Sequence, residues 1–357
     1  PDPGEVSSTV ARVMASLLKK DHVGEHDNFF DIGGHSLLAM RLLGRLRREG
    51  LENVTIQDIV ETGSPAALAA RLSGGGSSQI LPLGPGTRTP LFAVHPGGGF
   101  ALPFRGLADR LSAEDVPVTG LQLPDPHPEV TDLSELASGY VDSVMQVQDH
   151  GPYRLLGYSF GGVLAQAMTA ELLRRGEQVS WLGIMDAYPA GHGPVTRSTA
   201  DAVNAANAAG TAGTADAAGR GGNLTAAQIA AVAGVPDIDD LPGGAEAADA
   251  VTHTLGANLA YCDGLLRSAS PVDLSGFTGV VQLIVATRAD PRVAGLHGAP
   301  GGWDPATAWA GVWDPATAWA GVLDTPPRVL ELDLTHAGLA TDAGWDASTP
   351  SILKGLQ

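Results

Sequence analysis

One serine of the chain lies between glycines, at the junction of two segments with different hydrophobic patterns. Ser159 is the centre of the run GYSFG at 157–161. An apolar segment at 153–157 lies before this serine, and an apolar-striped segment at 160–175 follows it. The first pattern is that of a buried strand and the second is that of a helix. Glycines on both sides permit the sharp strand-to-helix turn that exposes a serine hydroxyl. The pattern therefore predicts that Ser159 is a nucleophile.

A serine hydroxyl needs a neighbouring base before it can attack at neutral pH, and the chain has ten histidines. His336 follows the last predicted strand, 328–334, which is where the base stands when a nucleophile occupies such a turn. His35 and His95 lie in glycine-rich turns. The remaining histidines are expected on the surface or in a covering segment: His22, His26, His127, His150, His192, His253 and His297. We therefore predict that His336 is the base.

Two aspartates could orient this base. Asp186 ends the strand predicted at 179–185, directly after the helix that Ser159 begins. Asp290 follows the next predicted strand, 280–287. Since both positions could reach His336, the residues alone leave the acid open.

Backbone N–H groups near Ser159 could bind the negative oxygen of a tetrahedral intermediate. The N–H of Phe160 lies at the start of the predicted helix. A second donor is expected in the run HPGGG, which begins at His95 after the strand predicted at 91–94 and leaves its backbone uncovered. Gly97 is the predicted donor, with Gly98 as the next choice.

A second serine, Ser36, ends the run GGHS and begins a segment of helical pattern. A phosphodiester at this place would meet free backbone N–H groups and the positive end of the helix dipole. Serine is equally suited to cap the N-terminus of such a helix, so the residues alone leave both roles open.

The hydrophobic patterns divide the chain into two parts. An apolar stripe at 10–18, a second at 36–46 and a short segment at 66–72 predict a small helical bundle. Beyond the uncharged run SGGGSS, apolar runs alternate with helical segments, which predicts a parallel sheet covered on both faces. The predicted strands are 91–94, 116–123, 153–157, 179–185, 280–287 and 328–334, and helices are predicted at 133–148 and 160–175. The expected domains are 1–73 and 90–357, with a linker at 74–89 and a lid at about 189–258.

Composition excludes several classes of protein. A net charge of −18 disfavours a nucleic-acid partner. The single cysteine, Cys262, cannot form an internal disulfide or a cysteine-based metal site, which indicates a reducing cytoplasm, and no metal is expected. No apolar run is long enough to span a membrane, and the start at Pro1 indicates a piece of a longer chain. Residues 303–312 recur unchanged as 313–322, and no function is assigned to this repeat.

Residues 5–73 resemble the peptidyl carrier domain of nonribosomal peptide synthetases, because the run DNFFDIGGHSL at 27–37 matches its GGHS motif. The resemblance implies an all-α four-helix bundle. It also implies that Ser36 carries 4′-phosphopantetheine, which a phosphopantetheinyl transferase attaches from coenzyme A.

Residues from about 80 to the end resemble the thioesterases of the same synthetases, which are α/β-hydrolases with a helical lid. Ser159, Asp186 and His336 fall on the motifs of that family in order, and the run WLGIMDAYP at 181–189 resembles its acid-bearing segment. The resemblance therefore favours Asp186 over Asp290. The repeated decapeptide and the long lid depart from the family pattern and leave the range of substrates open.

Together the two resemblances imply the release of a finished peptide. The peptidyl thioester on the arm at Ser36 would pass to Ser159, and water or a group of the peptide itself would then complete hydrolysis or macrocyclisation. The expected partners are upstream synthetase modules and the peptidyl substrate. Two alternatives stay open: a carrier and docking module with a silent α/β scaffold, and an editing thioesterase that removes stalled acyl groups.

Overall fold

The computed structural model describes residues 3–34, 36–51, 54, 58–59, 62–72, 79–124, 127–190, 245–288, 319 and 322–357. The chain divides into two units. Residues Pro1–Ser78 and Asp237–Thr254 form the first unit, and residues Gln79–Pro236 and Leu255–Gln357 form the second. Each unit packs around buried apolar side chains of its own. In the part of the chain that is described, no helix has both the length and the apolar character to cross a membrane.

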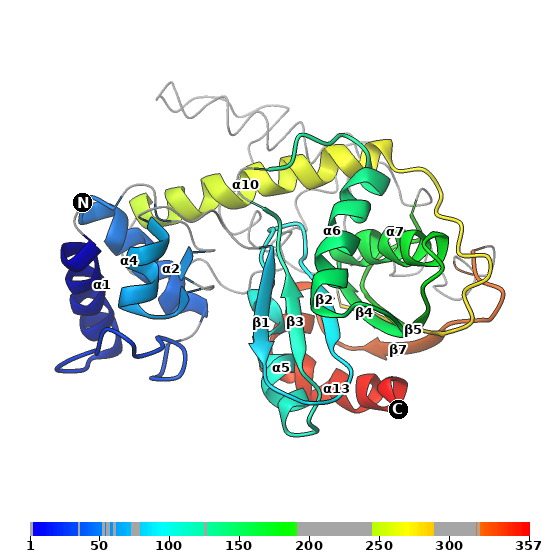
Figure 1. The fold of residues 1–357 in the computed structure, drawn as a ribbon, viewed down its shortest axis with the longest axis horizontal. Helices are drawn as coiled ribbons and strands as arrows, with labels where there is room; N and C mark the ends of the chain where they lie inside the picture. Colours follow the sequence, from blue (N-terminus) through cyan, green and yellow to red (C-terminus); the bar gives the residue numbers. More distant parts are fainter. Residues whose placement is uncertain are drawn as a thin grey trace. The chain divides into compact units, whose positions relative to one another are not determined.

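The first unit contains three described helices, namely α1 (Pro3–Leu18), α2 (Ser36–Arg48) and α4 (Pro65–Leu72), which are drawn in blue in Figure 1. The apolar stripe of α1 is buried, and α1 packs against both α2 and α4. The side chains that fill this small core include Val10, Val13, Met14, Leu42, Leu43 and Leu68. These contacts fit the predicted helical bundle, whose fourth helix stays a prediction.

The second unit is built on one seven-stranded sheet in the order β1-β3-β2-β4-β5-β6-β7. Its strands are β1 (Ile80–Gly84), β2 (Leu91–Val94), β3 (Val118–Leu121), β4 (Tyr153–Tyr158), β5 (Val179–Met185), β6 (Val280–Ala286) and β7 (Arg328–Leu332). All neighbouring pairs are parallel except β1 with β3. The predicted, mostly parallel sheet is therefore confirmed.

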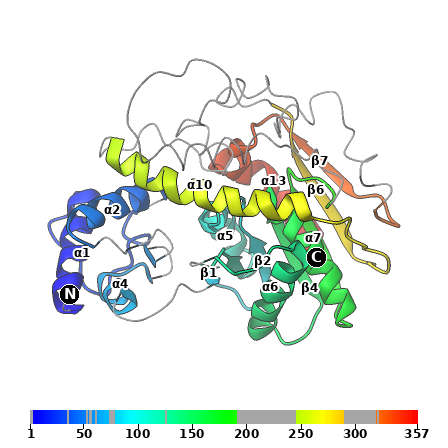
Figure 2. The same ribbon diagram turned by 90° about the horizontal axis from the view of Figure 1, so that it is seen from above.

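Helices cover both faces of this sheet (Figures 1 and 2). On one face, α6 (Leu133–Val147) packs on α7 (Phe160–Arg174), which lies against β4 and β5. On the other face, α5 (Arg105–Ser112) lies against β1 and β3, and α13 (Asp342–Leu356) lies against α5 and the strands from β5 to β7. The carboxyl ends of the parallel strands are thus left for the loops that carry the predicted site residues.

The prediction of a linker at 74–89 was wrong for residues 80–84. Residues Ile80–Gly84 form β1, which pairs antiparallel with β3 at the edge of the sheet. Leu81 and Leu83 point into the core, whereas Pro82 is exposed. An edge strand tolerates such a proline, because only one side of the strand must supply N–H groups to a neighbour.

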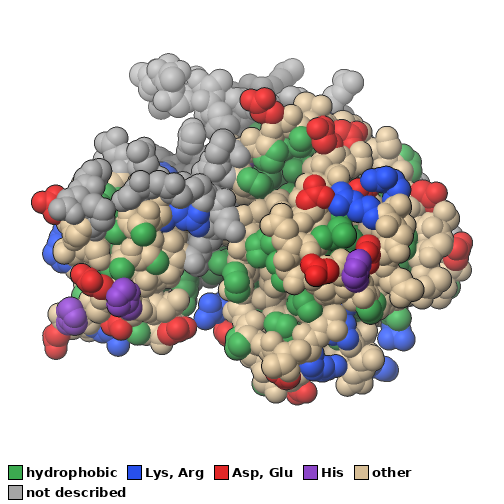
Figure 3. Space-filling view, viewed as in Figure 1, with side chains coloured by type: hydrophobic (Ala, Val, Ile, Leu, Met, Phe, Trp, Pro, Cys, Tyr) green, Lys and Arg blue, Asp and Glu red, His purple; other side chains and the backbone are tan. Residues whose placement is uncertain are grey.

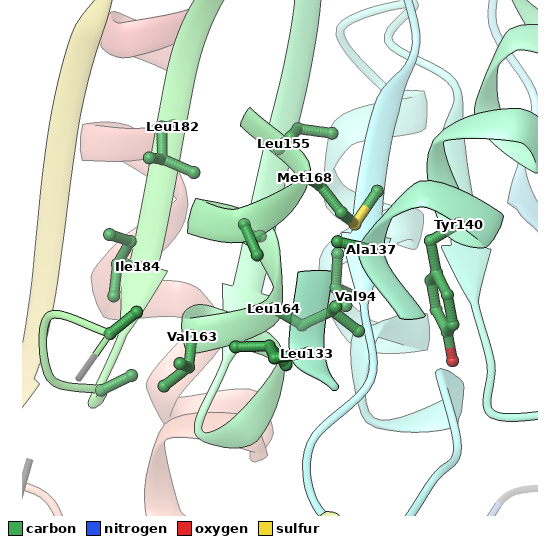
Figure 4. Close-up of a cluster of buried hydrophobic side chains, with 14 of the residues drawn as sticks. Val94, Leu133, Ala137, Tyr140, Leu155, Val163, Leu164, Met168, Leu182 and Ile184 are labelled. Carbon is green, nitrogen blue, oxygen red and sulfur yellow. The ribbon is translucent and has the colours of Figure 1, made fainter. Parts of the chain in front are cut away.

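The core between α6, α7 and the sheet holds α7 in place. Figure 4 shows Val163, Leu164 and Met168 of α7 lying among side chains of α6, β4 and β5. Val163 is the most exposed of these three α7 side chains, at 8%. Since packing on this scale fixes rotamers and backbone alike, the N-terminus of α7 is rigidly placed at the end of β4.

The predicted lid at about 189–258 lies outside the described residues between 191 and 244. Its last part, 245–258, belongs to α10 (Ala245–Ser268), a helix that continues ten residues past the predicted end of the lid. From Leu255 onward, α10 belongs to the second unit. Asp290 and most of the repeated decapeptide also lie outside the described residues.

An ion-pair cluster joins α6 to the end of α7. Glu171 accepts hydrogen bonds of 2.7 Å from the Nε atoms of Arg174 and Arg175, and Arg175 also lies 2.6 Å from Asp142. The bond from Arg174 is the main reason that the pKa of Glu171 falls to about 2. Figure 3 shows acidic and basic side chains lying beside one another on the visible face.

Glu171→Gln is expected to lower the free energy of unfolding by about 1–3 kcal/mol at neutral pH, because a charge-assisted pair is lost. A carboxylate whose pKa is lowered in the folded state stabilises the fold at pH values above its ordinary pKa. The difference between wild type and variant should therefore shrink as the pH falls below 4.5 and vanish near about 2. Urea unfolding across this pH range is the measurement, with the exposed Glu129→Gln as the control. A difference that does not depend on pH would contradict this account.

Candidate active site

Ser159 stands in the predicted sharp turn between β4 and α7. Its φ of +55° and ψ of −123° are unusual for a residue with a side chain. A Cβ on Gly157 would collide with the backbone of Gly161, and a Cβ on Gly161 would collide with the carbonyl oxygens of Val94 and His95. Gly157 is therefore required for the sharp turn from β4 into α7, and Gly161 for the close approach of α7 to the end of β2.

Asp186 follows β5 and binds the side chain of His336. The Nδ1 atom of His336 lies 2.5 Å from Oδ2 of Asp186, and the two side chains are 3% and 0% exposed. The other carboxylate oxygen, Oδ1, accepts a 3.2 Å bond from the N–H of Ala286, and the N–H of Asp186 donates to the carbonyl of Ile284. The carboxylate is thus held by the neighbouring strand β6 and faces one ring nitrogen of His336.

Two contacts bring His336 and Asp186 to the residues around Ser159. The hydroxyl of Tyr158 donates a 2.6 Å bond to the carbonyl of His336, and the rings of Tyr158 and His336 have centroids 4.8 Å apart. The N–H of Ser159 donates a 2.8 Å bond to the carbonyl of Met185, which precedes Asp186. These contacts therefore place three of the predicted site residues at the carboxyl ends of the parallel strands, namely Ser159, Asp186 and His336.

Tyr158 was not among the residues that the sequence singled out. In the sequence it stands between the predicted strand 153–157 and Ser159, and its bond to His336 depends on the position of the loop after β7, which no local pattern predicts. The alternative acid, Asp290, lies outside the described residues. The contact with His336 supports Asp186 in the role, which stays a proposal.

The predicted oxyanion donors lie where the loop after β2 meets the start of α7. Gly97 and Gly98 are the central residues of a turn that is closed by a 2.9 Å bond from the N–H of Gly99 to the carbonyl of Pro96. Phe160 is the first residue of α7, so its N–H has no acceptor within the helix. The role of these N–H groups as oxyanion donors stays a proposal.

His95 supports this turn rather than acting as a base. Its ring is fully buried, with Nδ1 2.6 Å from the carbonyl of Pro96 and Nε2 2.7 Å from the hydroxyl of Tyr140. Burial lowers the pKa of His95 to about 4, so the ring is neutral at pH 7. The neutral ring donates from Nδ1 to Pro96 and stacks on Phe160, with centroids 5.7 Å apart.

The loop before Ser36, in the first unit, is held by Phe29 and by two glycines. Phe29 is fully buried, and its carbonyl accepts a 2.8 Å bond from the N–H of Gly34, which has no room for a side chain beside the Phe29 ring. Gly33 has a φ of +110°, a conformation that suits glycine. As predicted, α2 begins at Ser36. A hydroxyl-bearing residue at the first turn of a helix, after a bare glycine turn, fits a covalently attached phosphodiester group.

Comparison with known proteins assigns both units. Residues 8–72 match the family described as "Phosphopantetheine attachment site", and residues 89–217 match the family described as "Thioesterase domain". The second unit thus belongs to a family of enzymes that act on thioesters, and the cofactor of the first is 4′-phosphopantetheine, bound covalently to a serine.

The curated relatives are much longer than this chain. Malpibaldin synthetase of Mortierella alpina is 42% identical over 195 residues, which are 52% of this chain and 4% of the relative. The dimodular nonribosomal peptide synthase of Bacillus subtilis (strain 168) is 38% identical over 197 residues, which are 53% of this chain and 8% of the relative. The chain therefore spans only a small part of the curated relatives it matches.

A solved structure shares the fold of the second unit. The thioesterase domain of NocB, in covalent complex with a fluorophosphonate nocardicin G analogue, has a TM-score of 0.52 and 24% identity. The match covers 78% of this chain and all of the NocB domain. With the two family matches in this order, the chain is a carrier–thioesterase didomain, and the curated relatives that it resembles include nonribosomal peptide synthetases.

Proposed function

We propose that the chain releases a finished peptide by moving it from a thioester to Ser159 and then to a second nucleophile. The contact between Asp186 and His336 beside the turn of Ser159 carries this proposal, because it supplies an oriented base next to a nucleophile. An inert scaffold would have no need for a buried carboxylate and a buried imidazole at this place.

In the first step His336 accepts the proton of the Ser159 hydroxyl while the serine oxygen attacks the thioester carbonyl. Asp186 keeps the proton of Nδ1 in place, so that Nε2 is the nitrogen that accepts, and it stabilises the charged ring that results. The negative oxygen of the tetrahedral intermediate is bound by the N–H groups of Phe160 and Gly97. Return of the proton to the departing sulfur leaves an acyl group on Ser159.

In the second step His336 removes a proton from the incoming nucleophile, and the same N–H groups bind the second tetrahedral intermediate. Water as the nucleophile gives a linear acid. An amine or hydroxyl group of the peptide gives a ring instead, and exclusion of water from the site favours this outcome.

Ser36 is the residue that would hold the 4′-phosphopantetheine arm. When bound, the arm supplies the thiol that holds the peptide as a thioester. The first turn of α2 offers backbone N–H groups to its phosphate, and the rigid packing of Phe29 against Gly34 fixes the loop that precedes the attachment point. The proposed partners are a phosphopantetheinyl transferase and upstream modules of a synthetase.

Intact mass spectrometry of the whole chain tests this function. A phosphopantetheinyl transferase and a peptidyl coenzyme A should add one peptidyl arm to wild type and none to Ser36→Ala. The peptidyl mass should then leave the wild-type chain and stay on a chain that was first treated with a fluorophosphonate, whose label should map to Ser159.

The controls separate the parts of the proposal. Ser77→Ala, which changes a serine outside both predicted sites, should load and release as wild type does. Loading of Ser36→Ala would overturn the attachment site. Release at an unchanged rate from the fluorophosphonate-treated chain would overturn the role of Ser159.

A further inference from the structure

The turn that carries Gly97 is built of three successive glycines and must be held by its surroundings. Glycine has more conformational freedom than any other residue, so a GGG turn has no preference of its own for one backbone geometry. Oxyanion donors work only when they are fixed before the charge develops. The neighbours that fix the turn are therefore part of the catalytic geometry.

Asn258 of α10 supplies one of these contacts. Its side-chain Nδ2 donates a 2.8 Å bond to the carbonyl of Gly98, and Asn258 is only 7% exposed. The N–H of the same peptide unit, that of Gly99, donates to Pro96. The peptide between Gly98 and Gly99 is thus held at both ends, once by the turn itself and once by α10.

His127 fixes the direction of the Asn258 amide. The Nε2 atom of His127 lies 2.7 Å from Oδ1 of Asn258. Since Nδ2 of Asn258 faces a carbonyl, Oδ1 must accept, and the proton of His127 must be on Nε2. The ring of His127 in turn packs on Tyr261 of α10, with centroids 4.7 Å apart.

Leu259, the next residue of α10, packs on the same turn. A Cβ placed on Gly97 would lie 2.8 Å from Cδ2 of Leu259, so Leu259 rests directly on the backbone of Gly97. Leu259 is 7% exposed. Two adjacent residues of α10 therefore touch the two central glycines, one by a hydrogen bond and one by packing.

We propose that Asn258, oriented by His127, is a positioning residue that sets the oxyanion turn for catalysis, so that the turn is formed only while α10 is docked on it. The proposal rests on the proposed thioesterase function. Asn258 does not touch the reacting atoms and acts through the backbone of Gly98. It follows that undocking of α10 would leave Ser159, Asp186 and His336 in place and still slow the reaction.

The test uses the whole chain with an acyl pantetheine thioester as substrate. Asn258→Leu keeps the volume of the side chain and removes the amide. Loss of an oxyanion donor costs about 10²–10³-fold in kcat, and a donor that is loosened rather than removed should cost about 10–100-fold. We expect this fall in kcat with little change in KM, because the ground state of the thioester carries no oxyanion.

Two further measurements separate positioning from a merely structural role. A trifluoromethyl ketone analogue of the substrate forms a tetrahedral oxyanion on Ser159, so its Ki in Asn258→Leu should rise by the factor by which kcat/KM falls. Asn258→Asp puts a carboxylate beside the carbonyl of Gly98, which regains a donor when the carboxylate is protonated. Because position 258 is buried, the pKa of the new carboxyl should be raised above its ordinary value, so the activity of this variant relative to wild type should rise from about pH 8 to about pH 5, whereas the ratio for Asn258→Leu should stay flat.

Control variants complete the design. Ser268→Ala removes a 2.8 Å bond from α10 to the carbonyl of Thr131 and should leave kcat unchanged. His127→Phe keeps a ring against Tyr261 but loses the bond to Asn258, and the double variant with Asn258→Leu should be no slower than Asn258→Leu alone.

Failure of the inference differs from failure of the function. An active wild type with an unchanged kcat in Asn258→Leu, or with an unchanged Ki of the ketone, overturns the positioning role and leaves the thioesterase function standing. A wild type that does not turn over the thioester overturns both.

Discussion

Asp186→Asn is expected to lower kcat for thioester hydrolysis by about 10⁴-fold with little change in stability. The N–H of Ala286 donates to Oδ1 of Asp186, so the new amide must keep its oxygen at that position. Its NH2 group then faces Nδ1 of His336, where a carboxylate oxygen now lies at 2.5 Å. The ring must accept there and carry its proton on Nε2, and an Nε2 that already holds a proton cannot take one from Ser159.

Asp290→Asn is the matched control, because Asp290 is the alternative acid that the sequence left open. Steady-state kinetics should give this variant wild-type kcat, and the two variants should have similar melting temperatures. The reverse result, with Asp290→Asn inactive and Asp186→Asn active, would move the role to Asp290.

Gly161→Ala is expected to lower the free energy of unfolding by at least about 3 kcal/mol and to abolish the labelling of Ser159 by a fluorophosphonate. The added methyl group would collide with the carbonyl oxygens of Val94 and His95. Both are backbone atoms at the end of β2, so a rotamer change cannot relieve the collision. The start of α7 must move instead, and Ser159 moves with it.

Gly139→Ala is the control for this change. Gly139 is an exposed residue of α6 with no atom within 4 Å of the place where its Cβ would be. Alanine in the interior of a helix should stabilise the chain by about 0.5–1 kcal/mol. Urea unfolding and probe labelling of both variants would decide the matter, and a stable, fully labelled Gly161→Ala would refute the proposed geometry of the turn.

The buried strands could be predicted closely from the sequence. The bounds predicted for β2 and β5, 91–94 and 179–185, are those of the structure. A central parallel strand is buried on both faces, so its apolar run is continuous and its ends are clear. Edge strand β1 gave no such signal, because Pro82 interrupts its short apolar run and one of its sides faces no other strand.

Two helices were also missed, for reasons that lie in their composition. The interior of α13 contains Pro350, a residue that ordinarily ends a helix, and its first turn contains Gly344, which is a poor helix former. The other, α5, has only eight residues, which is too short for a periodic pattern to be clear. Their positions depend on packing against the sheet, a non-local property.

The site was predictable in part. The proposed nucleophile and the proposed oxyanion turn have local patterns, since glycines lie on both sides of Ser159 and form the turn at 97–99. The partner of His336 has no such pattern, because Asp186 and Asp290 each follow a predicted strand in the sequence, and the contact of Asp186 with His336 depends on the order of strands in space. Asn258 lies in a segment that was predicted as part of a lid, and its partners Gly98 and His127 are more than a hundred residues away in sequence.

Ser159 and Asp186 share a property with consequences for attempts to engineer the protein. They are two of the four non-glycine residues with a positive φ in the described part of the chain, at +55° and +49°. Such conformations cost about 1–3 kcal/mol each, so favourable packing in the rest of the fold must offset this cost. A laboratory selection for heat resistance alone would favour glycine at both positions, and robustness gained there would come directly at the expense of turnover.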